Sequence, residues 1–476
     1  MKLSEQLFAR KSIEVLLAET EGEHGLRKVL GPVALTALGV GCIIGAGIFV
    51  LTGLAANQYA GPALTLSFVV AGLGCTLAAL CYAEFASTVP VAGSAYTYAY
   101  ATLGELLAWI IGWDLVLEYA VASSTVAHGW SHYFVLFLGI FGIELPHMWV
   151  GNPFDYDPAT GSWVATGAIM NLPAFLVVML VTAILVLGIR ESARFNAAMV
   201  ILKVAVVLFV IVVGAGYVDT ANWDPYMPYG FSGVLKGAAY IFFAYIGFDS
   251  VSTHAEEAKN PQRDVPIGII VSLLLCTILY ILVAAVLTGM VPYKSIHLDA
   301  PVAEAFGARG LAAAQLLVAA GAVVGITSVL LVLLLSQARI LLALARDGLI
   351  SRSFFGAVHP RFRTPHKATI LTGILVGLAG ALLPLKLLAD LVNIGTLMAF
   401  VVVCGAVMVM RRTHPDLHRP FRTPLMPWVP IGGIVVNLAM MLSLGWENWL
   451  RLAVWLGIGL AIYFVYGRRH SKLAHP

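Results

Sequence analysis

The chain has 476 residues, of which 60% are hydrophobic and 11% are charged, and its formal net charge is +3. Soluble globular proteins carry about 25% charged residues, so this composition, with a mean hydropathy of +0.90, excludes a soluble protein and indicates an integral membrane protein. The small net charge indicates nothing further, and we expect no nucleic-acid partner.

Apolar runs of roughly 20 residues, long enough to cross a hydrocarbon core about 30 Å thick, recur about twelve times. The sequence therefore predicts an all-α integral membrane protein with twelve transmembrane helices in the lipid bilayer. The ninth run is short for a span. In chain order, the predicted spans are residues 32–54, 62–87, 95–126, 173–188, 197–218, 231–253, 266–291, 311–343, 369–383, 387–410, 427–444 and 449–466.

Charges flank these spans unevenly. Residues 1–31 carry scattered charges and lack the uninterrupted apolar core of a cleavable signal, so they predict an amphipathic cytosolic segment before a transmembrane domain at 32–467. Lys and Arg gather in the loops on the side of the N-terminus, whereas the long third outer loop, 128–171, has neither. This bias predicts a multi-pass protein of the cell membrane with a cytosolic tail at 468–476 and both termini in the cytoplasm.

Two predicted spans are interrupted near their middle. Residues 39–49 read GVGCIIGAGIF, and residues 242–250 read FFAYIGFDS. Unpaired backbone groups cost several kcal/mol in hydrocarbon, so a span unwinds only where it lines a cavity or binds something. Each interruption opens a set of five spans, at about 32–218 and 231–410. Because five is odd, the two sets face opposite ways, which predicts an inverted repeat with a substrate site at its interface; two extra helices follow at about 427–466.

The first interruption suits a zwitterion. Glycines such as Gly45 and Gly47 permit close approach of a ligand. The free N–H groups that start the outer half-helix suit a carboxylate, and the carbonyls that end the inner half-helix suit an ammonium or a cation. An alternative explanation is that these small residues only let helices pack closely. A dinucleotide site at Gly39-x-Gly41 is excluded, since no strand or βαβ unit precedes it.

Several charged residues fall inside predicted spans. Lys203 would cost at least about 2.5–3.5 kcal/mol there, so we expect it to exchange a proton, although its ammonium could instead reach the cytosolic surface. Glu118 lies one turn after Asp114 and could pair with a cationic substrate or with a polar group on a neighbouring helix. Asp249 is expected to cap the inner half-helix at the second interruption, and Glu84 to serve packing or gating.

Neither a cofactor nor a metal is expected. His128 and His132 have the i,i+4 spacing of a metal pair, but no third ligand is evident, so we expect histidines at the outer surface. The five cysteines all fall inside predicted spans without C-x-x-C spacing, which indicates small packing residues rather than a disulfide framework or a zinc site. A membrane-embedded enzyme would need a nucleophile–base pair or a metal cluster within the spans, and a channel would not need occluding interruptions.

Four segments carry a family resemblance. Residues 39–49 resemble the first-helix signature of the amino acid–polyamine–organocation (APC) transporter superfamily. Residues 242–249 with the following EEAKNPQR are similar to the sixth helix and its exit loop in the cationic amino acid transporter branch. The strings GITSVL at 325–330 and ARDGL at 345–349 are similar to that branch as well. The resemblance spans essentially the whole chain, and twelve spans are typical of bacterial members.

The resemblance implies a LeuT-like five-plus-five inverted repeat with discontinuous first and sixth helices, in which the first, second, sixth and seventh helices rock against the third, fourth, eighth and ninth. It also implies a substrate site at the two interruptions. There the carboxylate would meet the N–H groups of Ala46 and Gly47, and Phe243 would gate the pocket. The α-ammonium would meet carbonyls from both interruptions, and the implied substrate-binding set is Ile43, Gly45, Ala46, Gly47, Phe243, Ala244, Tyr245 and Ile246.

Three further residues take roles from the resemblance. Glu118 matches an acidic position near the substrate side chain. Lys203 matches the fifth-helix lysine of proton-coupled members, where its contacts would be carbonyls near residues 39–41 and the hydroxyl of Ser328. A protonated Lys203 would hold the inner part of the first helix, and loss of the proton to the inside would favour the inward-open state.

Together these arguments predict a secondary active amino acid permease rather than an enzyme. The first hypothesis is proton-coupled import, by alternating access, of cationic or broad-range L-amino acids. An exchanger or a neutral amino acid permease is the alternative, and a membrane-embedded enzyme is a remote one. The preferred amino acid, the direction of net flux and a small membrane subunit as partner stay open.

Overall fold

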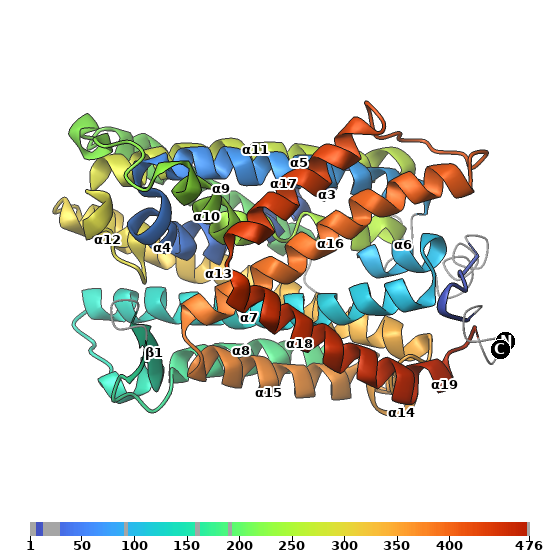
Figure 1. Ribbon diagram of the computed structural model, residues 1–476. Coiled ribbons are helices and arrows are strands. Elements are labelled where there is room, and N and C mark those ends of the chain that lie inside the picture. Colours follow the sequence, from blue (N-terminus) through green and yellow to red (C-terminus); the bar gives the residue numbers. More distant parts are fainter. Residues whose placement is uncertain (1–5, 13–28, 90–93, 158–161, 189–192, 474–476) are drawn as a thin grey trace.

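The computed structural model describes residues 6–12, 29–89, 94–157, 162–188 and 193–473. Most of the predicted N-terminal segment at 1–31 lies outside these residues. Long helices run side by side along one axis, and the first and last described segments of the chain, residues 6–12 and α19 (Arg468–His470), lie at the same end of the bundle (Figure 1). There the side chain of Gln6 donates to the carbonyl oxygen of Arg468 at 2.7 Å. An even number of membrane crossings places the beginning and the end of a chain on the same side of the membrane, which agrees with this contact.

In the described part of the chain, eight helical stretches are long and apolar enough to cross a membrane, and four shorter apolar helices accompany them. The multi-pass helical architecture is therefore confirmed, while the count of twelve crossings and the inverted repeat stay predictions. The main helices are α3 (Pro32–Ile43), α5 (Leu64–Thr88), α7 (Glu105–Ile140), α8 (Leu172–Leu187), α9 (Ala193–Ala215), α10 (Gly230–Ile241), α11 (Pro261–Met290), α13 (Ala312–Arg346), α15 (His366–Leu382), α16 (Leu385–Thr413), α17 (Trp428–Ser443) and α18 (Trp446–Ile462).

Short elements join these helices. Among the described residues, strands occur in one antiparallel hairpin that pairs Phe154 with Ala165. It lies at the end of the bundle away from the chain ends (Figure 1). The short elements are α4 (Thr52–Ala55), α6 (Ser94–Thr102), α12 (Pro301–Ala308), α14 (Arg352–Phe355), α19 (Arg468–His470), β1 (Phe154–Asp157), β2 (Ser162–Ala165), η1 (Gly47–Leu51), η2 (Ala56–Ala60), η3 (Gly61–Ala63), η4 (His147–Trp149), η5 (Thr220–Trp223), η6 (Phe242–Tyr245), η7 (Asp249–Glu257), η8 (Tyr293–Ser295) and η9 (Tyr463–Gly467).

The third predicted span, 95–126, is wrong at both ends. Helix α6 stops before Gly104, whose φ of +103° is open to glycine but strained for other residues, and α7 then runs unbroken to Ile140. The loop predicted from 128 therefore begins only after α7. His128 is 2% exposed inside the helix, and its ring Nδ1 lies 3.1 Å from the carbonyl oxygen of Gly380. The expectation of a surface histidine is wrong at this position, because a neighbouring helix satisfies the ring.

Two groups of helices pack around the centre. In the first, α3 and α5 pack against α11, and α10 packs against α5. In the second, α7 packs against α8, α13 and α15. Both interrupted segments, α3 with η1 and α10 with η6, belong to the first group. Helix α16 contacts α7 of the second group as well as α5 and α17, so it lies at the boundary.

Candidate functional site

The first interruption is present in the structure. Helix α3 ends at Ile43, and Ile44 leaves the helical conformation with φ −72° and ψ 104°. The chain then turns through Gly45 and re-enters a helix, the π-helical turn η1, at Gly47. The span is thus divided into two halves, as the glycine-rich string predicts.

The second interruption is present as well. Helix α10 ends at Ile241 and tightens into the 3₁₀ turn η6, after which Ile246 adopts φ −58° and ψ 134°. Gly247 follows with φ +115°, a conformation that favours glycine. The chain resumes as the 3₁₀ helix η7, which begins at Asp249.

The two interruptions are in direct contact. A Cβ on Gly47 would lie 2.2 Å from the Cα of Ala244, and one on Gly247 would lie 2.9 Å from the carbonyl oxygen of Cys42. A Cβ on Gly45 would lie 2.8 Å from the side chain of Val329 in α13. These glycines therefore allow close packing, as the alternative explanation held, and this packing brings the peptide groups of both interruptions together.

Two tyrosine hydroxyls donate hydrogen bonds to backbone carbonyls in this region. The sequence predicted a site role for Tyr245 but not for Tyr280. The hydroxyl of Tyr280 in α11 donates to the carbonyl oxygen of Ile43 at 2.7 Å. This carbonyl is one of the acceptors expected for the substrate ammonium. Tyr245 donates to the carbonyl oxygen of Phe68 at 2.9 Å. The position of Tyr280 inside an apolar span could have indicated this contact, because a buried tyrosine hydroxyl needs a hydrogen-bond partner.

Lys203 lies beside the first interruption. Its ammonium nitrogen donates to the carbonyl oxygen of Gly41 at 2.6 Å, and the residue is 1% exposed. The alternative, in which the ammonium reaches the cytosolic surface, is therefore wrong. Gly325 of α13 packs against its methylene groups, and Ser328 one turn later donates to the carbonyl oxygen of Gly325 at 3.1 Å. A contact between Lys203 and the hydroxyl of Ser328 stays a prediction.

Acidic side chains lie between α7, α16 and η7. Asp249, the first residue of η7, accepts a hydrogen bond from Tyr119 at 2.8 Å, and its expected role as a cap stays a prediction. Glu118 is 2% exposed and lies beside Thr396. In the described part of the chain, one Glu118 oxygen and both Asp114 oxygens have no hydrogen-bond partner. The structure thus gives Glu118 a polar neighbour and leaves it a free acceptor, so both predicted roles stay open.

Residues that could hold a metal are not gathered in the structure. Across the described ranges, no group of three His, Cys, Asp or Glu side chains could hold a metal ion. His132 lies 3.0 Å from the carboxylate of Asp299 instead, and it contacts the ring of His128 at a centroid distance of 4.7 Å. The five cysteines, all within the described residues, are buried and form no disulfide.

A family comparison identifies the kind of protein. The family described as amino acid permease matches residues 30–464, which is nearly the whole chain. The chain belongs to the amino acid permease family. The resemblance to the APC superfamily is therefore confirmed.

Relatives of this permease are transporters. It is 52% identical over 468 residues to the branched-chain amino acid permease BcaP of Bacillus subtilis, with 98% of this chain and 99% of the relative covered. It is 48% identical over 467 residues to the methylthioribose transporter of the same organism, with 98% and 99% covered. It is 41% identical over 417 residues to the vacuolar cationic amino acid transporter 4 of Arabidopsis thaliana, with 86% and 68% covered. The permease is thus a transporter and not an enzyme.

Proposed function

We propose that this permease is a proton-coupled importer of L-amino acids that works by alternating access in the cell membrane, with both termini in the cytoplasm. The observation that carries the proposal is the contact between the ammonium of Lys203 and the carbonyl oxygen of Gly41. A buried ammonium beside an interrupted helix can hold that helix while it is protonated, because a charged donor makes a stronger hydrogen bond than a neutral one.

The two interruptions supply the substrate site. The N–H groups of Ala46 and Gly47 at the start of η1 receive the substrate carboxylate, since the N-terminal end of a helix favours an anion. The α-ammonium is received by carbonyl oxygens from both interruptions, and Phe243 closes the pocket. The contact between Gly47 and Ala244 supports this arrangement, because it brings donors and acceptors from both interruptions within reach of one small molecule. The proposed acceptors are the carbonyls of Ile43, Phe243, Ala244 and Ile246.

Coupled transport requires that the substrate and the proton shift the same conformational equilibrium of the protein. In the proposed cycle, the helices of the first packing group (α3, α5, α10 and α11) rock against those of the second (α7, α8, α13 and α15). Lys203 on α9 links α3 with α13, because it contacts Gly41 on one side and Gly325 on the other. Release of its proton to the inside weakens the hold on α3 and favours the inward-open state. Substrate and proton then act on the same equilibrium, as coupled transport requires.

Two preferences for the side chain of the substrate amino acid are supported. A cationic or broad preference is supported by buried Glu118 and by the cationic amino acid transporters among the relatives. A neutral, branched-chain preference is supported by 52% identity to a branched-chain permease and by apolar Val329 packed against Gly45. We propose the broad preference first, because it accommodates both kinds of relative.

Uptake into proteoliposomes tests this function. Radiolabelled arginine, lysine, leucine and alanine are offered with an inward proton gradient, with a sodium gradient alone, and with unlabelled amino acid inside the vesicles. Accumulation driven by protons and indifferent to sodium is expected. Accumulation driven by sodium alone would overturn the proton coupling. Uptake that appears only against preloaded amino acid would favour the exchanger.

A further inference from the structure

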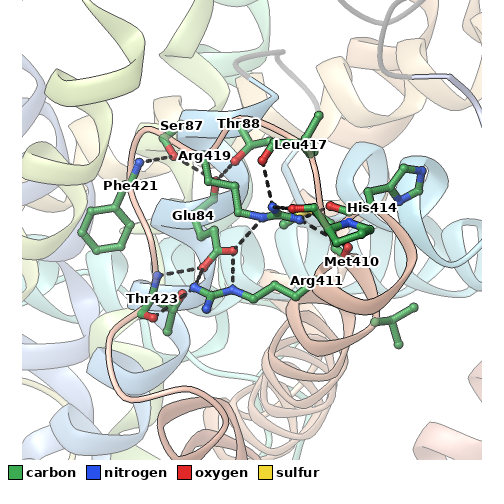
Figure 2. A network of polar contacts seen from close by, with 12 residues as sticks. Glu84, Ser87, Thr88, Met410, Arg411, His414, Leu417, Arg419, Phe421 and Thr423 are labelled. Carbon is green, nitrogen blue, oxygen red and sulfur yellow. Dashed lines mark hydrogen bonds and ion pairs between the residues drawn. The ribbon is translucent and has the colours of Figure 1, made fainter.

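Two buried glutamates show how this permease compensates a carboxylate that has no access to water. Glu84 of α5 is fully buried, and both of its oxygens accept hydrogen bonds from Arg411 of α16, at 2.9 and 2.6 Å (Figure 2). The guanidinium of Arg419 lies 3.4 Å from the same carboxylate, and the backbone N–H of Thr423 donates to it at 2.7 Å (Figure 2). A buried carboxylate can remain charged with such partners.

Glu105, the first residue of α7, is compensated in a similar way. It is fully buried, and the hydroxyls of Tyr463 and Tyr100 donate to its two oxygens at 2.8 and 2.9 Å. The hydroxyl of Ser471 is a third donor. Glu84 and Glu105 therefore both have a hydrogen-bond donor at each of their oxygens.

Asp114, on the same helix as Glu105, is built differently. It lies about two and a half turns after Glu105 and is 0% exposed. Among the described residues, neither of its carboxyl oxygens has a hydrogen-bond partner. Helix α16 approaches it through Gly395, where a Cβ would lie 2.8 Å from its Oδ1. Because a charged carboxylate without partners is far more costly to bury than a neutral one, these surroundings favour a bound proton.

Neighbouring carboxylates add to the need for a proton. Glu118, one turn later on α7, lies within electrostatic range of both Asp114 and Asp249. Tyr119 donates to Asp249 at 2.8 Å, and Glu118 lies beside Thr396. Like charges at close range disfavour one another, so three buried carboxylates cannot all remain ionised without a cation. Asp114 has the fewest partners of the three and is therefore the first to take up a proton.

The surroundings of Asp114 supply no compensating positive charge in the described part of the chain, since no Lys, Arg or His forms an ion pair with any of the three carboxylates. The helices that pack close by present other groups. A Cβ on Gly112 would lie 2.9 Å from the ring of Tyr96 in α6 and 2.9 Å from the side chain of Leu344 in α13. The hydroxyl of Tyr96 donates to Asp347 at 2.7 Å and is thus used elsewhere.

We propose that Asp114 is a second proton-binding site of this permease, in addition to Lys203. This inference rests on the proposed proton-coupled import and deepens it. In the state that the structure shows, the Asp114 carboxyl group holds its proton. In the inward-open state water reaches the group and the proton leaves to the cytoplasm. The carboxylate then takes up a new proton from the outside, so that two protons accompany each amino acid, one on Lys203 and one on Asp114.

The number of protons per amino acid can be measured as a balance point. Proteoliposomes are loaded with leucine at about ten times the outside concentration, and potassium with valinomycin holds the membrane potential at zero. The inward proton gradient is then varied until net leucine movement stops. A tenfold concentration ratio and one pH unit are equal free energies, so one proton balances the leucine at about one pH unit and two protons at about half a unit.

We expect a balance point of about half a pH unit for the wild type and about one unit for D114N, whose amide keeps the shape of the side chain but exchanges no proton. D114E should return the value to about half a unit. D264N is the matched control and should keep the wild-type value. Asp264 is also buried, at 3% exposure, but it accepts a hydrogen bond from the backbone N–H of Asn260 at 3.2 Å.

The possible outcomes separate this inference from the proposed function. A balance point of about one pH unit in the wild type would overturn the second site and leave proton coupling standing. The same half unit in D114N as in the wild type would also overturn it. A wild type that does not respond to a proton gradient would overturn the proposed function, and the inference would fall with it.

A substrate contact through Asp114 gives a different pattern. In that case D114N would weaken arginine binding more than leucine binding in a thermal-shift titration, and the balance point for leucine would stay at about half a unit. This result would overturn the proton site, because the carboxylate would then serve the substrate side chain.

Infrared spectroscopy of the purified permease gives a measurement that does not depend on transport. A carboxylic acid that holds its proton without a hydrogen bond has a C=O stretch at higher frequency than an ionised carboxylate or an amide. The wild type at neutral pH should show such a band, and D114N should lack it. Absence of the band from the wild type would show that Asp114 is ionised, and an equal band in D114N would assign the proton to another group. Either result would overturn the proposal.

Discussion

The ammonium of Lys203 donates to the carbonyl oxygen of Gly41 at 2.6 Å across 162 positions of sequence. This contact joins α9 to α3, the first half of an interrupted helix. Gly41 lies two residues before α3 ends. We therefore expect a change in the charge of Lys203 to affect the point where α3 ends.

Removal of the Lys203 ammonium should separate binding from accumulation. K203A is expected to retain amino acid binding within several-fold, because the proposed substrate contacts are backbone groups, but to lose accumulation against a gradient. Thermal shift with added amino acid measures the binding, and proteoliposome uptake with an inward proton gradient measures the accumulation. Undiminished accumulation in K203A would show that the proton is carried elsewhere.

A methyl group at Gly47 should disrupt the crossing of the two interruptions. In G47A the new Cβ would lie 2.2 Å from the Cα of Ala244, so backbone must shift. Overpacking of this kind costs about 1–3 kcal/mol of stability, and uptake should fall at least tenfold because the substrate groups are displaced. G139A is the matched control, since nothing lies within 4 Å of a Cβ at Gly139. Normal uptake by G47A would contradict the proposed site.

Loss of the Tyr280 hydroxyl should weaken substrate binding. In Y280F the carbonyl oxygen of Ile43 loses its donor. A hydrogen bond of this kind contributes about 0.5–1.5 kcal/mol, which corresponds to roughly a two- to tenfold loss of affinity if it fixes the carbonyl for the α-ammonium. Y217F, at an exposed tyrosine, should leave affinity unchanged. The check is a titration of each variant with leucine followed by thermal shift.

Substitution of Glu118 should discriminate between substrates. E118Q is expected to weaken arginine uptake at least tenfold and alanine uptake less than twofold, because a hydrogen bond to a charged group contributes about 1.5–3 kcal/mol. Competition of both amino acids against one labelled substrate gives the ratio in a single assay. Equal losses for arginine and alanine would make Glu118 a structural partner of α16.

Local sequence signals were sufficient for much of the fold. Apolar length predicted each main helix to within several residues, because crossing hydrocarbon demands a minimum run. The exception was the third span, where buried His128 was taken for a surface residue. Its partner, the carbonyl of Gly380, comes from a helix 252 positions away, and no local pattern announces it.

By itself, the sequence determined that this protein crosses a membrane repeatedly and that two of its helices are interrupted, since hydropathy and glycine strings act on the nearest residues alone. The tertiary structure decided which groups meet. It turned Lys203 toward Gly41, gave the carbonyl of Ile43 to Tyr280, and paired Glu84 with Arg411 across 327 positions. A charge or hydroxyl inside an apolar span indicates that a partner is needed, but only the packing of distant helices decides which group that partner is.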